Sequence, residues 1–187
     1  MTAAVSLVPA TLDSTVSRPQ SPSAMALHPA GSGRVSVELI DIAVGLATTA
    51  RHIPVDDGDD TRRYARVLST PLYEAWVIRW SASAALTLHD HGGSSGAVVV
   101  VDGELVEVRI ANPPWRASRS RTLHRGDVLA INPDTVHSIS NEQTSDALSV
   151  HVYSPPLSTM TFYDELDGQL TRTKTSRPAS TQPPLLP

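Results

Sequence analysis

The 187-residue sequence predicts an all-β domain, a sandwich or closed barrel, with a short helical segment before the first strand. Between residues 64 and 163, short runs of apolar and β-branched residues alternate with turn signals such as Asp102-Gly103. Ahead of them, residues 35–50 carry apolar side chains at the spacing of one helical face, namely Leu39, Ile42, Ala43 and Leu46. A chain of this length can bury one core of its own.

Each expected element follows from its local pattern. The helical segment is expected to pack on the outside of the barrel, because only one of its faces is apolar. The strands are expected where apolar or alternating runs lie between Gly, Pro, Asn and Asp residues. In chain order they are Tyr64–Leu68, Tyr73–Trp80, Ala85–Asp90, Ala97–Val101, Leu105–Ile110, Arg121–His124, Asp127–Ile131, Val136–Ser140, Leu148–Tyr153 and Thr159–Tyr163.

We expect one domain over residues 34–170, flanked by two tails. Residues 1–33 are rich in Ala, Ser, Thr and Pro and show little apolar periodicity, which is typical of disordered segments. Residues 171–187 are rich in Pro, Thr and Ser. They are expected to be disordered for the same reason.

Composition disfavours several classes of function. The chain contains no cysteine, so it forms no disulfide, and the reducing cytoplasm is its expected location. A net charge of −4 with scattered signs disfavours binding to nucleic acid or to an anionic membrane. Neither a signal peptide nor a transmembrane run is expected. We expect small-molecule partners and a monomer or weak oligomer.

Three histidines give the strongest functional signal. His89 and His91 alternate around Asp90, so on a strand both imidazoles point to one face while the carboxylate points to the other. His137 lies in a second strand motif further along the chain. Imidazole suits iron, copper, nickel and zinc, and three imidazoles leave coordination positions open for chemistry. The sequence therefore predicts a three-histidine metal site on a β-scaffold.

The surroundings of these histidines resemble the two signature motifs of the cupin superfamily, in which a small β-barrel holds a metal at its mouth. The first motif matches His89–His91, Gly92–Gly96 and Ala97–Val101, and the second matches Gly126-Asp127, Pro133-Asp134 and His137. Cupins usually carry a glutamate at the position of Gly96. The resemblance therefore implies a cupin fold whose metal site has three histidines and no carboxylate.

A further series of residues is more specific. Ser149, His151 and Tyr153 are spaced by two, so they line one face of one strand and can form a hydrogen-bonded relay. This series, the Ser-Pro-Pro that follows it, the segment HDHGGSSGA and Tyr64-Ala65-Arg66 resemble the cysteine dioxygenase family. The resemblance extends over about residues 60–165. It also implies a cis peptide bond between Ser154 and Pro155.

The resemblance implies a role for each of these residues. The iron ligands would be His89, His91 and His137; the catalytic group would be Tyr153, supported by His151 and Ser149; the substrate-binding set would be Arg66, Tyr64 and Trp80. L-cysteine would bind Fe(II) through its thiolate and amine, and O2 would take the remaining position. Arg66 would hold the substrate carboxylate. Transfer of both oxygen atoms to sulfur would give cysteine sulfinic acid.

One departure concerns Gly96. Animal members of the family join a cysteine at this position to the pocket tyrosine, whereas bacterial-type members commonly have glycine, so Tyr153 is expected to be uncrosslinked. Three alternatives stay open. One is a dioxygenase for another small thiol such as 3-mercaptopropionate, whose relatives tend to carry glutamine in place of Arg66. The others are a zinc hydrolase or hydratase and a non-catalytic ligand-sensing cupin.

Overall fold

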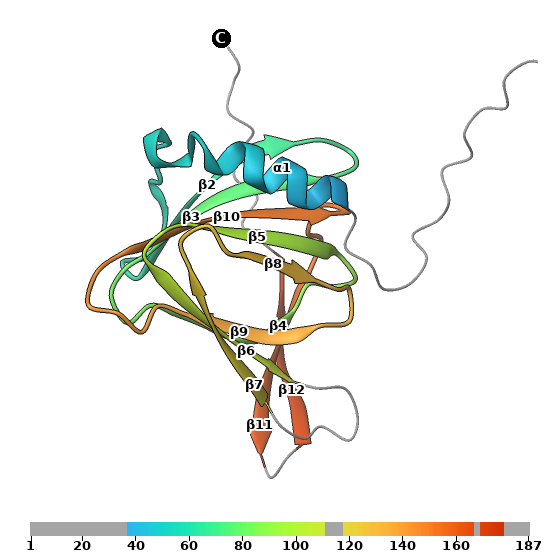
Figure 1. Ribbon diagram of the computed structural model, residues 1–187. Helices are drawn as coiled ribbons and strands as arrows, with labels where there is room; N and C mark the ends of the chain where they lie inside the picture. Colours follow the sequence, from blue (N-terminus) through green and yellow to red (C-terminus); the bar gives the residue numbers. More distant parts are fainter. Residues whose placement is uncertain (1–36, 111–117, 167–168, 178–187) are drawn as a thin grey trace, which may run out of the picture. The chain divides into compact units, whose positions relative to one another are not determined.

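The computed structural model describes residues 37–110, 118–166 and 169–177, all within the unit Ser32–Pro187. The tail expected at residues 1–33 lies outside these ranges. The described chain begins with helix α1 (Val37–Ala47) and the 3-10 helix η1 (Ala50–His52), and continues as β-strands (Figure 1). Neither of these helices is long and apolar enough to cross a membrane.

The strands form two six-stranded antiparallel sheets that enclose the interior between them. The first sheet has the order β1 (Asp57–Gly58), β2 (Arg62–Ser69), β3 (Glu74–Trp80), β10 (Ala147–Ser154), β5 (Ser95–Asp102), β8 (Val128–Ile131). The second sheet has the order β12 (Gln169–Ser176), β11 (Met160–Leu166), β4 (Ala85–Asp90), β9 (Val136–Ser140), β6 (Glu104–Ile110), β7 (Ser118–His124). This arrangement confirms the predicted all-β class with a short helix before the first strand.

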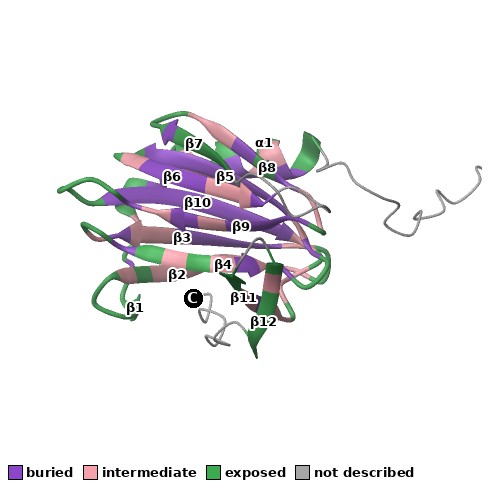
Figure 2. Cartoon of the chain, turned by 90° about the horizontal axis from the view of Figure 1, so that it is seen from below, coloured by how far each residue is buried: buried purple, intermediate pink, exposed green. Residues whose placement is uncertain are grey.

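Strand β10 is buried on both of its faces, as is most of β5 (Figure 2). Outward from the first sheet, Leu148, Val150 and Val152 pack in one apolar cluster with Leu39 and Ala43 of α1. Because the helix covers this face, β5 is continuously apolar over Ala97–Val101, and β10 turns its apolar residues outward beneath the helix while its polar residues alternate with them. The predicted position of the helix on the outside of the barrel is therefore confirmed.

The inner faces of the two sheets enclose a second apolar cluster. It fills part of the interior with the large buried side chains of Trp80, Leu105, Leu123, Ile131 and Ile139. The polar residues of β10 face the same interior, because strand residues spaced by two share a face. The core therefore holds one end of the interior rigid, and the polar side chains occupy the space next to it.

Strands β4 and β9, which carry His89 and His137 and position His91 directly after β4, have the bounds that the sequence predicts. The end of the chain differs from the prediction. Residues 171–176 were expected to begin a disordered tail, but they belong to β12, which pairs with β11 along its length. The segment is mostly exposed, so it carries no hydrophobic pattern. Its order comes from the backbone ladder and from β-branched threonines, which favour strands. Residues 178–187 lie outside the described ranges.

Candidate metal centre and pocket

The three predicted histidines meet inside the barrel. His89 lies on β4, His91 directly follows the end of that strand, and His137 lies on the neighbouring β9, directly opposite His89 in the strand register. One ligand atom from each residue lies within 4.8 Å of the others. All three residues are buried, with 1% of their surface or less exposed. The strands therefore bring three imidazoles to one point.

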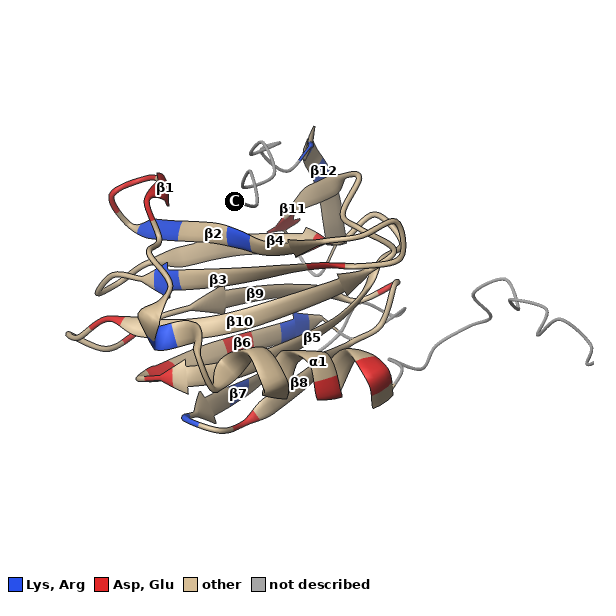
Figure 3. Ribbon diagram, turned by 90° about the horizontal axis from the view of Figure 1, so that it is seen from above, with Lys and Arg blue, Asp and Glu red and all other residues tan. Residues whose placement is uncertain are grey.

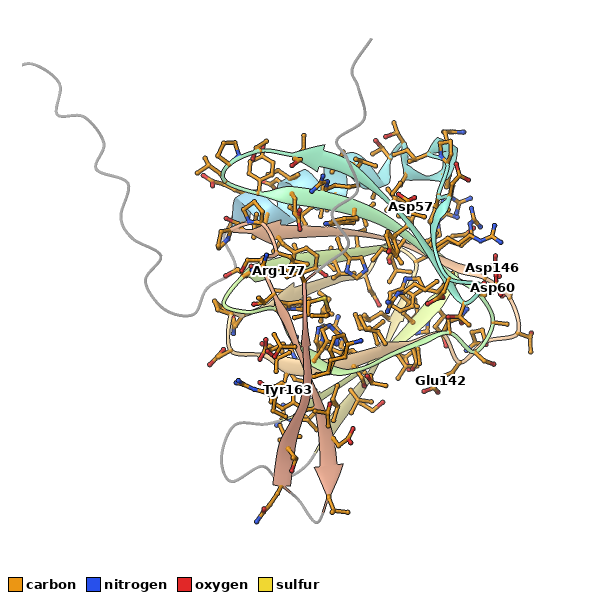
Figure 4. The ribbon with its side chains drawn as sticks, turned by 180° about the vertical axis from the view of Figure 1, so that it is seen from behind. Asp57, Asp60, Glu142, Asp146, Tyr163 and Arg177 are labelled. Carbon is orange, nitrogen blue, oxygen red and sulfur yellow. The ribbon has the colours of Figure 1, made fainter. Side chains whose placement is uncertain are left out.

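The residue between the first two histidines points the other way, as strand alternation requires. The carboxylate of Asp90 accepts a hydrogen bond from the Gly92 backbone N–H at 2.8 Å and from the Tyr163 hydroxyl at 2.6 Å. Tyr163 lies on β11 (Figure 4). These contacts fix the end of β4 and, with it, the direction of both imidazoles.

The ring nitrogens of the three histidines differ in their partners. His89 Nδ1 lies 2.8 Å from the Thr87 carbonyl oxygen, and His137 Nδ1 lies 2.9 Å from Glu107 Oε1. Both nitrogens of His91, and Nε2 of His137, are buried with no hydrogen-bond partner among the described residues. Buried polar atoms are normally paired, so these nitrogens indicate a group that completes them.

Burial keeps two of these imidazoles, those of His89 and His91, neutral. Burial, with a smaller contribution from His137, lowers the pKa of His89 to about 3. Burial and the neighbouring histidines also hold the pKa of His91 well below its usual range. A neutral imidazole has the free lone pair that a metal ion needs. His89 and His91 therefore offer free lone pairs to a metal at neutral pH.

A chain of hydrogen bonds runs along the inner face of the first sheet. Trp80 Nε1 donates to Ser149 Oγ at 2.9 Å, Ser149 Oγ lies 2.9 Å from His151 Nε2, and His151 Nδ1 lies 3.0 Å from the Tyr153 hydroxyl. We call these four residues the relay. The sequence predicts the last three members, and the structure adds Trp80 as the first.

Trp80 sets the direction of the relay, because an indole N–H can only donate. The Ser149 oxygen accepts from it, so the Ser149 hydroxyl proton goes to His151 Nε2; the opposite tautomer would leave this proton without an acceptor among the described residues. His151 Nδ1–H then donates to the Tyr153 oxygen. Burial, His137 and Arg62 lower the pKa of His151 to about 3, which keeps it neutral. The Tyr153 proton is left to face a ligand.

Tyr153 lies beside the triad, with its ring centroid 4.9 Å from that of His91. Burial and the charge of Glu74 raise the pKa of its phenol, so the hydroxyl stays protonated at neutral pH. A Cβ atom added at Gly96 would lie 3.0 Å from the Tyr153 ring. Glycine at this position therefore leaves room for the Tyr153 ring.

A cavity of about 210 Å³ adjoins the triad and the relay. Its walls are mostly apolar, and they include the triad, His151, Tyr153, Tyr64, Trp76 and Trp80. Two cations, Arg62 and Arg177, also line it, and none of the described residues that line it is Asp or Glu. Arg177 lies at the end of β12 (Figure 4), and basic residues lie along β2 (Figure 3). Such a pocket favours a small anionic ligand.

Comparison with known proteins gives this site a family. A family model described as cysteine dioxygenase type I matches residues 48–166, which contain the triad and the relay. The chain belongs to this family. Cysteine dioxygenase type 1 from Homo sapiens is 27% identical over 119 residues, which is 58% of this chain and 60% of that protein. The protein of the same name from Rattus norvegicus gives the same values. The chain thus spans 60% of the length of these relatives.

Similar solved structures include KdgF from Halomonas sp., at a TM-score of 0.48 and 21% identity over 56% of this chain and 88% of that one. Another is recombinant oxalate oxidase in complex with glycolate, at a TM-score of 0.49 and 14% identity over 58% of this chain and 59% of that one. The two antiparallel sheets and the match to the cysteine dioxygenase family together confirm the predicted cupin fold. The Ser154–Pro155 bond is cis, as the family resemblance implies.

The position of Arg66, the predicted carboxylate-binding residue, differs from that of the other two predicted substrate-binding residues. Tyr64 and Trp80 line the cavity, whereas Arg66 is not among its lining residues. Its guanidinium lies over the Trp76 ring, 5.6 Å from the centroid, and Nη1 lies 3.7 Å from Glu74 Oε2. Glu74 is buried and also accepts a hydrogen bond from the Leu157 N–H. Arg66 therefore already has a carboxylate beside it before any substrate arrives.

Sequence reasoning missed several residues at this site. Glu107 and Glu74 are buried carboxylates, but the sequences of their strands are typical of ordinary half-exposed strands. Arg62 lies two residues before the family motif that begins at Tyr64. The alternation of β2 could have identified Arg62 as a site residue, because Arg62, Tyr64 and Arg66 are spaced by two and share a face. No local pattern marks Arg177, which reaches the cavity only because β12 is ordered.

Proposed function

We propose that this protein is a thiol dioxygenase that oxidises L-cysteine to cysteine sulfinic acid with O2, using Fe(II) held by His89, His91 and His137. The observation that carries the proposal is the convergence of three buried imidazoles beside a tyrosine whose hydroxyl is directed by the relay. Membership of the cysteine dioxygenase family supports it.

The donor set fits ferrous iron. Three imidazole nitrogens suit iron, and the unpartnered nitrogens of His91 and His137 are the atoms that a bound ion would complete. When bound, the iron supplies adjacent open positions for the thiolate and O2 and a positive charge that favours the thiolate form of the substrate. Gly96 stands where many cupins have a ligand carboxylate, and within the described ranges the candidate set consists of the three histidines.

The first sheet orients the substrate in this proposal. Arg66 would turn part of its guanidinium from Glu74 to the substrate carboxylate and bind it by charge-assisted hydrogen bonds. The cations Arg62 and Arg177 make the pocket favourable for a thiolate that also carries a carboxylate. The buried Trp76 Nε1 has no hydrogen-bond partner among the described residues and can donate to the same ligand.

Tyr153 would act as a donor. Its phenol keeps its proton at neutral pH, and the relay leaves that proton directed toward the ligand. It would hydrogen-bond the reacting oxygen or the substrate headgroup. The apolar lining from Leu157, Met160 and Phe162 would exclude bulk water and strengthen these polar contacts.

The decisive experiment measures O2 consumption by the iron-loaded protein with L-cysteine and quantifies the sulfinate formed. We expect one sulfinate for each O2 consumed and no activity in the metal-free protein. Cysteamine and 3-mercaptopropionate are measured in parallel, because each lacks one of the functional groups of cysteine. A faster reaction with 3-mercaptopropionate would move the substrate assignment to another small thiol. Iron binding without O2 uptake for any of the three would overturn the proposed activity.

A further inference from the structure

A buried carboxylate stands directly behind one of the three histidines. Glu107 lies on β6 with 3% of its surface exposed, and its Oε1 lies 2.9 Å from Nδ1 of His137. Arg109 donates to the same oxygen from Nε at 3.2 Å and from Nη2 at 2.9 Å. Arg109 Nη2 also donates to the Ala130 carbonyl. The carboxylate is therefore held in place from two sides.

The protonation states follow from these contacts. The guanidinium of Arg109 is always charged and donates two hydrogen bonds to Glu107 Oε1, so Glu107 is the carboxylate of a charge-assisted pair. An ionised carboxylate can only accept, so His137 Nδ1 must carry the proton. The lone pair then lies on His137 Nε2, which is buried without a partner among the described residues.

The three histidines thus differ in what fixes them. His137 has an ionised carboxylate behind it, His89 has the neutral carbonyl of Thr87, and neither nitrogen of His91 has a partner among the described residues. A charged acceptor makes an imidazole a stronger donor to a metal than a neutral one does, and it fixes the ring more firmly. His137 is therefore the ligand whose strength the protein sets most directly.

We propose that Glu107 is a positioning residue of the metal centre, which holds His137 with Nε2 toward the ion and places one negative charge next to the site. The usual glutamate of the first cupin motif is replaced by Gly96, but Glu107 places a carboxylate one hydrogen bond away from His137. The charge of the bound ion is thus partly offset while no coordination position is used. The inference rests on the metal site of the proposed function and does not depend on the substrate.

The test is the metal affinity of Glu107→Gln, measured by titration with Co(II) or Fe(II) against a competing chelator. Glutamine keeps the shape of the side chain but removes the charge, and we expect a loss of roughly 10- to 100-fold in affinity. The visible absorption of the Co(II) form is expected to shift, because the donor strength of His137 changes. Neither readout depends on turnover.

Strand β6 offers a matched control. Glu104 also lies 2.9 Å from a histidine, His124 Nδ1, but this pair is on the surface and away from the triad. Glu104→Gln is expected to leave affinity and spectrum unchanged. Equal affinity and an unshifted spectrum in Glu107→Gln would overturn the inference while leaving the metal site intact. A wild-type protein that binds neither ion would instead overturn the proposed function.

A second variant covers the case in which Glu107→Gln does not fold. Arg109→Gln leaves the carboxylate on His137 and removes the cation that shares its oxygen. Since the carboxylate then acts on His137 alone, we expect metal affinity equal to or above that of the wild type. A loss in this variant would show that the Glu107–Arg109 pair is a structural support of β6 and would contradict a role for the charge.

Discussion

The three histidines at the second sheet and the relay of the first sheet differ in how their buried polar atoms are paired. At the second sheet, both nitrogens of His91 and Nε2 of His137 are buried without a hydrogen-bond partner among the described residues. In the first sheet, Ser149, His151 and Tyr153 are equally buried, but each is joined to the next in the relay. The unpaired ring nitrogens indicate where a metal ion would bind. The fully hydrogen-bonded relay indicates where the direction of a hydrogen bond is fixed.

This difference assigns separate tasks to the two sheets. The second sheet carries Glu107 and positions the proposed ligands, so damage there should be seen in metal binding. The first sheet supplies the relay and the cations along β2, so damage there should change the use of substrate while metal affinity stays constant. A variant in one sheet that changes both metal affinity and the use of substrate would contradict this separation of tasks between the two sheets.

The largest effect is expected from the second sheet. His137→Ala removes a ligand, so metal affinity should fall by more than the roughly 10- to 100-fold typical of outer-shell partners. The measurement is a chelator competition titration, with thermal unfolding of the metal-free protein as a check on folding. His124→Ala is the control, since His124 is an exposed histidine of the same sheet. Tight metal binding by His137→Ala would remove His137 from the ligand set.

The next effect belongs to the first sheet. Arg66→Gln is expected to lower kcat/KM for L-cysteine by roughly 10- to 100-fold, because a hydrogen bond to a charged group contributes about 1.5 to 3 kcal/mol. Cysteamine has no carboxylate and should lose little. The measurement is steady-state O2 uptake with both thiols at matched iron content. Metal affinity should not change.

The contact between Arg66 and Glu74 requires its own control, because the single variant leaves Glu74 as a buried carboxylate without its cation. The double variant Arg66→Gln/Glu74→Gln removes both charges. If cysteine and cysteamine suffer equal losses in the single variant and recover together in the double variant, Arg66 supports the fold rather than the substrate.

Much of the site could be predicted because it depends on local alternation. The spacing of His89 and His91, and of Ser149, His151 and Tyr153, fixes which side chains share a face whatever the register. Strand bounds were predicted most accurately where turn residues lie close by, as at both ends of β9. These features require only the sequence within a few residues.

What could not be predicted depends on pairing between distant strands. Glu107 reaches His137 because β6 lies beside β9, and neither strand carries a sign of the other. The pairing of Arg66 with Glu74 likewise arises from the register of β2 with β3. Strand β12 has no apolar pattern at all, so its composition predicts disorder although its backbone is paired with β11.

A smaller effect is expected from the cation that the sequence did not single out. Arg62 lines the cavity, has no acidic partner within salt-bridge distance among the described residues, and lies over the Trp80 ring. Arg62→Gln should lower kcat/KM for L-cysteine by about 2- to 5-fold at low ionic strength, and less as salt screens the charge. Arg63→Gln makes the same charge change on the exposed face of β2. Identical kinetics for the two variants would show that the pocket does not use the charge of Arg62.

The smallest effect concerns the stability of the metal-free protein and the closed relay. His151 has a pKa of about 3 in the folded protein and 6.5 as its ordinary value, so the unfolded chain takes up a proton first as the pH falls. Its contribution to stability is complete above pH 6.5 and is lost between 6.5 and about 3. Removing this group in His151→Gln should therefore reduce the fall in unfolding free energy between pH 7 and 6 by about 0.7 kcal/mol. Denaturant titrations at the two pH values measure this difference.

Ser149→Ala is the control, because it breaks the same relay without removing a titrating group. This variant should keep the wild-type pH dependence of the unfolding free energy. If both variants reduce that dependence equally, the effect comes from the hydrogen bonds and not from the buried imidazole.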